Sequence, residues 1–565
     1  MQIDEDKTMT GAQIVAACLR REGVEVLFAY PGGTSMRLHQ ALLGSGIRVV
    51  LPRHEQGAAF AAGGYARMSG KAGVCMATSG PGATNLVTGI ADAWNDSVPL
   101  VAITAQVNQR LIGKNAFQET DIVGVTRPIV KHSYLVLSAA ELPEVIKDAM
   151  TLAVTGRPGP ILIDITCDVL RQECEPIFPE QPNLRAWTMV PDVEDAPFRK
   201  LLSALRGCRR PCIYAGGGIV HGNAAPLLQT FAQKWQIPVA TSLMGKGIFP
   251  EDNPLSLRML GMHGTYYANK AVNECDLLLA FGVRFSDRVT GEVSRFAPHA
   301  TIVHVDIDAS EINKNKQAQI ALNADIAQVL ELLCKEKPER HGRKAWLAEI
   351  DSWKRQHELQ GADGKAFTGP AAIQAISRET HGNATIVTGV GQHQMWTAQF
   401  YHFRHARQLL TSGGLGAMGF GLPAALGAKL AKPDELVVLV DGDGSFQMNI
   451  QELATVFAEK VPLKMVILNN RRLGMVYQWE ELFFDGTHAN TDMSLDGKYY
   501  PDFVTIAKGY GIPGVSVSTL KDFNAALRRM LAAEGPFLID ARIIEDEQVL
   551  PMIPAGGTCA DIITD

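Results

Sequence analysis

The chain has 565 residues, of which 46% are hydrophobic and 20% are charged, and these proportions exclude disordered and fibrous proteins. Its length exceeds what one hydrophobic core supports and predicts about three domains. The net charge of -6, without a long basic run, argues against nucleic acid as a partner, and no stretch reaches the roughly 18 apolar residues of a membrane span.

The first predicted domain occupies residues 1–175. Thr10 can cap a helix, and Gly23 can end that helix before a strand at 24–28. Helix and strand patterns then alternate as far as a strand at 161–165. This alternation predicts an α/β domain with a doubly wound parallel sheet.

The sequence also carries signals about location. Residues 1–7 are acidic and lack an apolar core, which is typical of neither a secretory signal nor a transit peptide. The nine cysteines are scattered and lack the paired spacing of a zinc site, so we interpret them as thiols in a reducing compartment. We therefore expect a cytoplasmic protein.

Two further domains follow. A proline-rich, weakly periodic stretch at 175–191 predicts a linker, and the alternating pattern restarts with a helix near Ala196 and a strand at 211–215. The second α/β domain is expected at 192–335. After a charged, glycine-containing connection, the third is expected at 365–565.

The third predicted domain contains the strongest local signal. Asp443 lies between two glycines after an apolar run at 435–440, and Asn470 follows a second run at 463–468. Such runs predict buried parallel strands, and open α/β sheets bind ligands at the carboxyl ends of their strands. A carboxylate and an amide oxygen suit Mg²⁺ bound to a diphosphate. For the Gly-Asp-Gly tripeptide alone, the alternative is an ordinary turn.

Longer stretches extend the pattern over nearly the whole chain, and they lie at residues 30–36, 53–67, 79–85, 115–121, 130–136, 261–264, 282–291, 390–396, 411–425 and 474–479. In this order they resemble the catalytic large subunit of acetohydroxyacid synthase, also called acetolactate synthase, a family of thiamine diphosphate-dependent enzymes. The resemblance runs from Thr10 to Thr564. It implies three doubly wound parallel-sheet domains that bind pyrimidine, FAD and diphosphate in chain order, the last with a C-terminal arm.

The resemblance implies how thiamine diphosphate is held and activated. Glu55 matches the glutamate beside the pyrimidine ring, Met418 matches the apolar residue that bends the cofactor, and Gln106 matches a glutamine near the reacting centre. Without the resemblance, Glu55 would be interpreted as a helix cap or a partner of Arg53, and Met418 as core filler. Further residues implied for this cofactor are Val390, Gly391, Gln392, His393, Gly416, Gly444, Ser445, Gly474 and Met475.

The implied Mg²⁺ ligands are Asp443, Asn470 and the backbone carbonyl of Arg472. The family places Glu55 and this metal site in different subunits, so a homodimer or a homotetramer is expected. A separate small regulatory subunit is compatible with the resemblance.

The second predicted domain matches the FAD site of the family. A triple glycine at 216–218 and an arginine-rich stretch at 284–288 each follow a predicted strand, and Asp306 ends a third strand with an acid suited to ribose hydroxyls. The FAD is expected to be structural, because the overall reaction has no net oxidation. The residues implied are Arg157, Gly216, Gly217, Ser242, Leu243, Met244, Met262, His263, Gly282, Arg284, Asp287, Arg288, Asp306 and Asp325.

The implied reaction is decarboxylation of pyruvate on thiamine diphosphate and transfer of the hydroxyethyl unit to a second pyruvate or to 2-ketobutyrate. The products are 2-acetolactate and 2-aceto-2-hydroxybutyrate, in branched-chain amino acid biosynthesis. Arg288 would bind the second carboxylate and Trp479 would favour 2-ketobutyrate; on their own they would be interpreted as a surface ion pair and a core aromatic. Phe117, Gln118 and Lys131 match positions of the access channel.

Two alternatives stay open at this point. Another thiamine diphosphate enzyme, such as a FAD-free catabolic acetolactate synthase or a pyruvate oxidase, would share the metal motif. The stretch at 284–288 argues against the catabolic enzyme, because family members without FAD lack it. A non-catalytic nucleotide-binding partner would share only the glycine turns.

Overall fold

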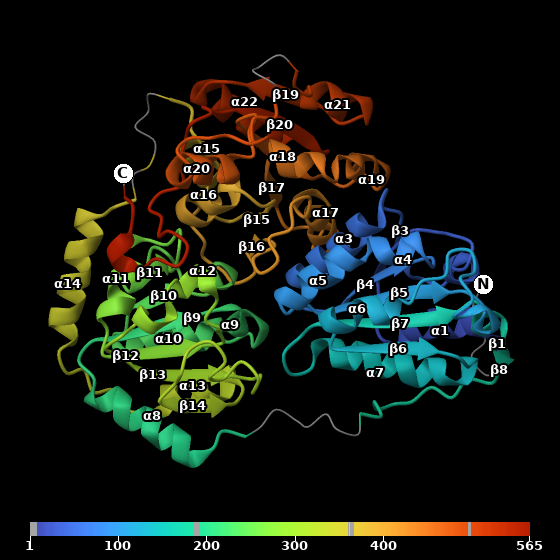
Figure 1. Ribbon diagram of the computed structural model, residues 1–565, viewed down its shortest axis with the longest axis horizontal. Coiled ribbons are helices and arrows are strands. Elements are labelled where there is room, and N and C mark those ends of the chain that lie inside the picture. The colour runs from blue at the N-terminus through green and yellow to red at the C-terminus, as the bar shows by residue number, and fades with distance from the viewer. Residues whose placement is uncertain (1–7, 185–191, 360, 362–365, 495–498, 565) are drawn as a thin grey trace.

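The computed structural model describes residues 8–184, 192–359, 361, 366–494 and 499–564, and it forms three α/β domains, each with a six-stranded parallel sheet (Figure 1). The predicted fold class is therefore confirmed. Residues 1–7, from which the absence of a leader was inferred, and the last part of the predicted linker, 185–191, lie outside the described residues.

The first sheet has the strand order β3 (Arg48–Val50), β2 (Val26–Ala29), β4 (Gly73–Ala77), β5 (Leu100–Gln106), β7 (Pro160–Thr166) and β6 (His132–Val136). Strands β4, β5 and β7 are buried along their whole length, as expected for the centre of a parallel sheet that is covered on both faces. The helices of this domain are α1 (Gly11–Arg21), α2 (Met36–Leu42), α3 (Glu55–Ser69), α4 (Pro81–Asn85), α5 (Val87–Asn95), α6 (Ile122–Thr126) and α7 (Leu142–Val154).

The first helix begins and ends where the sequence predicts. The hydroxyl of Thr10 accepts a hydrogen bond from the backbone N–H of Gln13, and Gly23 follows the helix with φ of +73°, a conformation that glycine adopts without strain. Strand β1 (Met9–Thr10) pairs antiparallel with β8 (Glu173–Cys174). This pairing joins the start of the first domain to its end.

The second sheet has the order β11 (Ser256–Met259), β10 (Val239–Thr241), β9 (Pro211–Ala215), β12 (Leu277–Phe281), β13 (Thr301–Asp306) and β14 (Ile320–Asn323). Its helices are α8 (Asp195–Gly207), α9 (Gly217–His221), α10 (Ala225–Trp235), α11 (Tyr266–Glu274), α12 (Asp287–Thr290) and α13 (Ile326–Lys335). Helix α14 (Arg343–Gln356) follows, and the indole N–H of Trp346 donates to the carbonyl of Pro211 at 2.9 Å. This bond attaches α14 to the second domain.

The third sheet has the order β16 (Leu409–Leu410), β15 (Thr385–Thr388), β17 (Val437–Gly442), β18 (Lys464–Asn469), β20 (Phe537–Arg542) and β19 (Gly514–Val517). Strands β17 and β18 are fully buried neighbours. The helices are α15 (Gly369–Glu379), α16 (Gln392–Phe400), α17 (Gly421–Ala431), α18 (Asp443–Gln447), α19 (Leu453–Ala458), α20 (Gly474–Phe483), α21 (Phe503–Gly509) and α22 (Leu520–Ala532).

Helices α3 and α17 bring the first and third domains together (Figure 1). A Cβ atom on Gly427 would overlap the carbonyl of Ala61, so glycine is needed where the two backbones approach each other. The carboxylate of Glu452 accepts a hydrogen bond from the backbone N–H of Arg53 at 2.9 Å. The start of α3, which carries Glu55, is thereby held against the third domain.

The C-terminal segment returns to the second domain. The backbone N–H of Ile553 donates to the carbonyl of Met262 at 2.8 Å, and the carbonyl of Gly557 accepts from the N–H of Glu292 at 3.1 Å. This segment closes one side of the region where the domains meet. None of the helices in the described part of the chain has the length and apolarity that a membrane span requires.

Candidate active site

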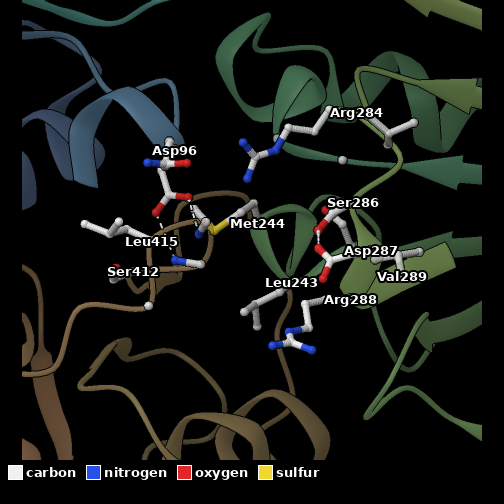
Figure 2. A pocket seen from close by; sticks show the side chains of 18 of the residues that line it. Asp96, Leu243, Met244, Arg284, Ser286, Asp287, Arg288, Val289, Ser412 and Leu415 are labelled. Carbon is white, nitrogen blue, oxygen red and sulfur yellow. Dashed lines mark hydrogen bonds between the residues drawn. The ribbon is translucent and has the colours of Figure 1, made fainter. Parts of the chain in front are cut away.

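A cavity of about 1730 Å³ lies where the three domains meet. Asp96 of the first domain, Arg284 and Arg288 of the second, and Ser412 of the third lie around it (Figure 2). Every residue predicted for FAD lines this cavity, and so do the following residues predicted for thiamine diphosphate: Val390, Gly391, Gly416, Met418 and Met475. One continuous space therefore connects the two predicted cofactor regions.

Glycines form the wall of the cavity in the second domain. The N–H of Gly218 donates to the carbonyl of Gly282 at 3.1 Å, and a Cβ atom on Gly218 would lie 2.5 Å from the Cα of Gly282. The ends of β9 and β12 thus meet without side chains, which leaves backbone accessible to a ligand. The carboxyl group of Asp306 lines the same cavity, and burial raises its pKa to about 7. A long cavity with a glycine wall and an acid at a strand end fits a dinucleotide such as FAD.

Arg157 reaches the cavity from the first domain. Its guanidinium group forms ion pairs with Asp308 at 3.1 Å and with Glu311 at 2.6 Å, and its Nε donates to the hydroxyl of Ser97. These bonds join the first and second domains at the cavity wall. The guanidinium is therefore fixed before any ligand enters.

The predicted metal ligands lie together at the carboxyl edge of the third sheet. Asp443 follows β17 directly and Asn470 follows β18, and these two strands pair in parallel register. The backbone N–H of Arg472 donates to the side-chain oxygen of Asn470 at 3.2 Å, so the chain turns back towards the metal position after β18. The sequence prediction that one sheet edge carries both side chains is confirmed.

The surroundings of Asp443 are those of a buried cation ligand. Its carboxylate is 2% exposed, and burial raises its pKa to about 7. The hydroxyl of Tyr500 donates a hydrogen bond to it, and no basic side chain of the described chain forms an ion pair with it. A buried carboxylate without a cationic partner is costly, and Mg²⁺ would supply the missing charge. The donor set of carboxylate, amide and carbonyl oxygens fits this ion.

Gln392 and His393 connect the metal position to the start of α16. The amide N–H of Asn470 donates to the side-chain oxygen of Gln392 at 3.1 Å. The Nε2 atom of His393 lies 3.4 Å from a carboxylate oxygen of Asp441 without forming a hydrogen bond. His393 is therefore buried beside Asp441, an acid that was not predicted from the sequence to belong to the site.

Three other residues predicted for the cofactor lie in the third domain outside the lining of the cavity. The hydroxyl of Ser445 accepts from the backbone N–H of Gly419 at 3.1 Å, next to Met418. Gly474 lies beside the side chains of Gln392 and Asn470, where a Cβ atom would come within 2.7 Å of the Asn470 amide nitrogen. Like Ser445 and Gly474, Gly444 does not line the cavity.

Arg288 and Trp479 face each other across the cavity. The guanidinium carbon of Arg288, from the second domain, lies 5.7 Å from the ring centre of Trp479, from the third. Trp479 is half-buried and stands edge-on to Phe483. The two residues therefore do not act as a surface ion pair and a core aromatic, and the cation lies where it can meet a carboxylate.

Glu55 does not line the cavity of the single chain. It is the first residue of α3 and half-buried, and its carboxylate accepts a hydrogen bond from the amide of Asn85 at 3.0 Å. His54 caps the helix, and Arg53 uses its guanidinium for the carbonyl of Leu51. Neither alternative interpretation of Glu55 therefore agrees with the structure, and its role in catalysis stays a prediction.

Gln106 is held by internal bonds. Its amide nitrogen donates to the carbonyl of Thr120 at 2.7 Å and to Asp164 at 3.0 Å, and its oxygen accepts from the backbone N–H of Val107 at 2.9 Å. Burial raises the pKa of Asp164 to about 7. The geometry favours a supporting role for Gln106 over direct contact with a substrate.

The predicted access-channel residues lie apart from the cavity. Phe117 is 88% exposed, and Gln118 has φ of +60° and lies against Gly80. The ammonium group of Lys131 donates to the carbonyl of Thr155 at 2.8 Å, and burial lowers its pKa to about 8. The single chain does not bring these three residues to the cavity.

Sequence reasoning missed several polar residues that shape the site. These are Asn85 beside Glu55, Asp441 beside His393, Tyr500 beside Asp443, and Asp96 at the cavity wall. Each comes from a segment distant in sequence from its partner or lies within an ordinary strand or turn. Of these residues, only Asp441 had a signal in the local sequence, because it is an acid next to a glycine at the end of an apolar run.

Comparisons with known proteins agree with this geometry. Residues 9–125 match the family model described as "Thiamine pyrophosphate enzyme, N-terminal TPP binding domain", residues 198–333 match its central domain and residues 389–541 match its C-terminal TPP binding domain. Similar curated proteins include acetolactate synthase 1, chloroplastic, of Nicotiana tabacum (49% identity, covering 99% of this chain and 86% of the relative). The enzyme of the same name from Oryza sativa is 51% identical (98% and 88%), and acetolactate synthase, chloroplastic, of Arabidopsis thaliana is 49% identical (99% and 85%).

These comparisons correct one prediction and support another. The expected cytoplasmic location is wrong, because these relatives are named chloroplastic. Composition and scattered cysteines suit any reducing compartment, so they could not separate the two locations. The predicted family, in contrast, is confirmed by identities near one half over almost the whole chain and by matches in all three domains. The chain belongs to the acetolactate synthase family of thiamine pyrophosphate enzymes.

Proposed function

We propose that this chain is an acetolactate synthase that works with thiamine diphosphate, Mg²⁺ and FAD. The observation that carries the proposal is the single cavity that runs from the glycine wall of the second domain to Met418 and Met475, with Arg288 and Trp479 between. The names of the relatives support this activity over that of a pyruvate oxidase or a catabolic enzyme. We assign pyrimidine binding to the domain at residues 1–175, FAD binding to the domain at 192–335 and diphosphate binding to the domain at 365–565.

In this proposal Asp443, Asn470 and the carbonyl of Arg472 would hold Mg²⁺, whose charge would serve to bind a diphosphate. When bound, thiamine diphosphate would supply a carbon nucleophile for a 2-keto acid. Glu55 would give and take a proton at its carboxylate, which is a task of general acid–base catalysis. Met418 positions the cofactor by packing against it.

In this proposal Arg288 and Trp479 recognise the second substrate. Arg288 presents a planar guanidinium group to the carboxylate of the acceptor, and Trp479 contacts its alkyl group. Pyruvate as acceptor gives 2-acetolactate and 2-ketobutyrate gives 2-aceto-2-hydroxybutyrate, the branch points of branched-chain amino acid biosynthesis. The chain would act as a homodimer or homotetramer, because Glu55 lies outside the cavity of the single chain, and a small regulatory subunit would be a further partner.

The proposal is tested by the product. Purified protein with pyruvate, thiamine diphosphate, Mg²⁺ and FAD is expected to release carbon dioxide and 2-acetolactate in equal amounts. Acetaldehyde or acetyl phosphate as the main product would exclude it. A flavin that is reduced by pyruvate in step with turnover would indicate a pyruvate oxidase instead.

The FAD assignment predicts different effects for two neighbouring glycines. A Cβ atom on Gly217 meets only ordinary contacts, 3.5 Å from the Cβ of Met244, whereas on Gly218 it would collide with Gly282. We expect Gly217→Ala to weaken FAD binding roughly tenfold with an unchanged melting temperature, because the methyl group enters an already fitted site. Gly218→Ala should lower the melting temperature as well. Flavin absorbance per chain after dialysis and thermal unfolding measure the two effects, and wild-type flavin retention in Gly217→Ala would contradict the assignment.

A substitution of Trp479 is expected to change the preference of the enzyme between the two acceptor substrates. We expect Trp479→Leu to lower the ratio of 2-aceto-2-hydroxybutyrate to 2-acetolactate by about tenfold, because the indole contact with one extra methyl group is lost. Both keto acids compete in one assay, and the products are quantified together. Trp353→Leu, on α14, is the control and should keep the wild-type ratio. A wild-type ratio in Trp479→Leu would show that another residue selects the acceptor.

A further inference from the structure

Asp96, at the cavity wall, forms hydrogen bonds that connect the first domain to the third. It ends α5, and its side chain is fully buried. One carboxylate oxygen accepts from the backbone N–H of Gly414 at 2.7 Å, and the other accepts from the N–H of Gly413 at 2.9 Å. Figure 2 shows both bonds running from Asp96 to the third domain. A side chain of the first domain therefore holds the backbone of the third.

Asp96 is also paired with a buried arginine. The Nη2 atom of Arg67 donates to Asp96 at 2.9 Å and to Asp92 at 2.8 Å. Hydrogen bonds to a charged acceptor are stronger than those between neutral groups, and the low exposure of all three side chains adds to the effect. The carboxylate of Asp96 is thus fixed by Arg67 on one side and holds the two glycines on the other.

The anchored segment is the loop 411–420, between β16 and α17, which carries Met418. It has no helix or strand of its own, and Gly413 and Gly414 are exposed in the single chain. Besides Asp96, the loop is supported by the hydroxyl of Ser412, which accepts from the N–H of Ala417 at 2.9 Å. The ends of the loop have partners in the third domain: the amide of Gln394 donates to the carbonyl of Ser412 at 3.1 Å, and the N–H of Gly419 donates to the hydroxyl of Ser445 at 3.1 Å. Between these ends, Asp96 accepts from the N–H groups of Gly413 and Gly414.

The second domain closes on the same two glycines. A Cβ atom on Gly413 would overlap the sulfur of Met244, and one on Gly414 would lie 2.6 Å from a guanidinium nitrogen of Arg284. Both neighbours line the cavity beside the loop. The two glycines therefore lie closely between Asp96 on one side and Met244 and Arg284 of the second domain on the other.

We propose that Asp96 is a positioning residue of the reaction: it fixes the loop 411–420 so that Met418 and the backbone near it are already in place when thiamine diphosphate binds. The inference rests on the proposed function, in which Met418 packs against the cofactor. Pre-ordering of a loop increases affinity because the ordering cost is met before binding.

The test compares Asp96→Asn with Asp148→Asn in the full-length protein. Asp148 is also buried in the first domain, and it accepts a backbone N–H, that of Asn183 at 2.8 Å, away from the cavity. Hydrogen exchange of the amides of Gly413 and Gly414 measures the loop directly. The half-saturating concentration of thiamine diphosphate measures its consequence, and kcat at saturating cofactor separates binding from turnover.

In the wild type, the two glycine amides should exchange at least about tenfold more slowly than in an unstructured peptide. Asp96→Asn should remove most of this protection and raise the half-saturating concentration about tenfold with a smaller change in kcat. Asp148→Asn should change neither. Equal shifts in both variants, or wild-type values in Asp96→Asn, would overturn the inference.

Two further outcomes are also decisive. If Asp96→Asn does not fold, unprotected glycine amides in the wild type overturn the proposal and protected ones support it. If the wild type makes no acetolactate, the proposed function fails, whereas the exchange rates still report whether Asp96 holds the loop.

Discussion

Glutamine in place of Glu55 is expected to reduce kcat for acetolactate formation about 100-fold or more, because general acid–base catalysis contributes roughly that factor. Glutamine keeps the size of the side chain and an oxygen that can accept from Asn85. It lacks the carboxylic proton that would be shared with the cofactor ring. The loss should therefore appear in kcat, with little change in flavin content or melting temperature.

Glu25→Gln is the matched control for this variant. Glu25 is an exposed acid of the same domain that pairs with Lys71, and its substitution should leave turnover unchanged. A Glu55→Gln enzyme with at least half of the wild-type kcat would show that another acid serves the cofactor.

Asparagine in place of Asp443 is expected to raise the half-saturating concentration of Mg²⁺ about 100-fold, since a direct ligand matters at least as much as the outer partners of a metal site. The substitution removes the charge that the buried site offers and leaves the hydroxyl of Tyr500 with a weaker acceptor. Turnover should recover in part at very high Mg²⁺. The measurement is a Mg²⁺ titration of activity after treatment with a chelator.

The stability of Asp443→Asn gives an independent readout. Burial raises the pKa of Asp443 to about 7, so the metal-free site disfavours the charge, and the neutral amide should not lower the melting temperature without Mg²⁺. Asp148→Asn is again the control and should titrate with Mg²⁺ like the wild type. An unchanged Mg²⁺ requirement in Asp443→Asn would refute the assignment of the metal site.

The sheet edges could be predicted because they depend on local sequence. The apolar runs before Asp443 and Asn470 are those of buried parallel strands, and chain order alone places their ends side by side, as β17 and β18 confirm. The glycines at 216–218 and at 282 follow the same logic in the second domain. Here the sequence was sufficient for the fold and for the sheet edge at which these residues lie.

Contacts between distant segments could not be predicted in this way. Nothing near Tyr500 indicates that its hydroxyl meets Asp443, and Asp96 lies in an ordinary helix end, more than 300 residues from the glycines that it holds. Gln106 shows the converse, because the resemblance implied a place near the reacting centre, whereas its amide group is bonded to Thr120, Asp164 and Val107. Side-chain bonding of this kind depends on tertiary packing.

Subunit mixing tests the central claim that Glu55 of one chain completes the site at Asp443 of another. Glu55→Gln and Asp443→Asn are each expected to be nearly inactive alone. When the two variants are mixed and the subunits exchange at random, half of the dimers combine both chains, and each such dimer has one intact site, so about one quarter of the wild-type rate of acetolactate formation should return. No recovery after demonstrated exchange would contradict the account and place both residues in the site of one chain.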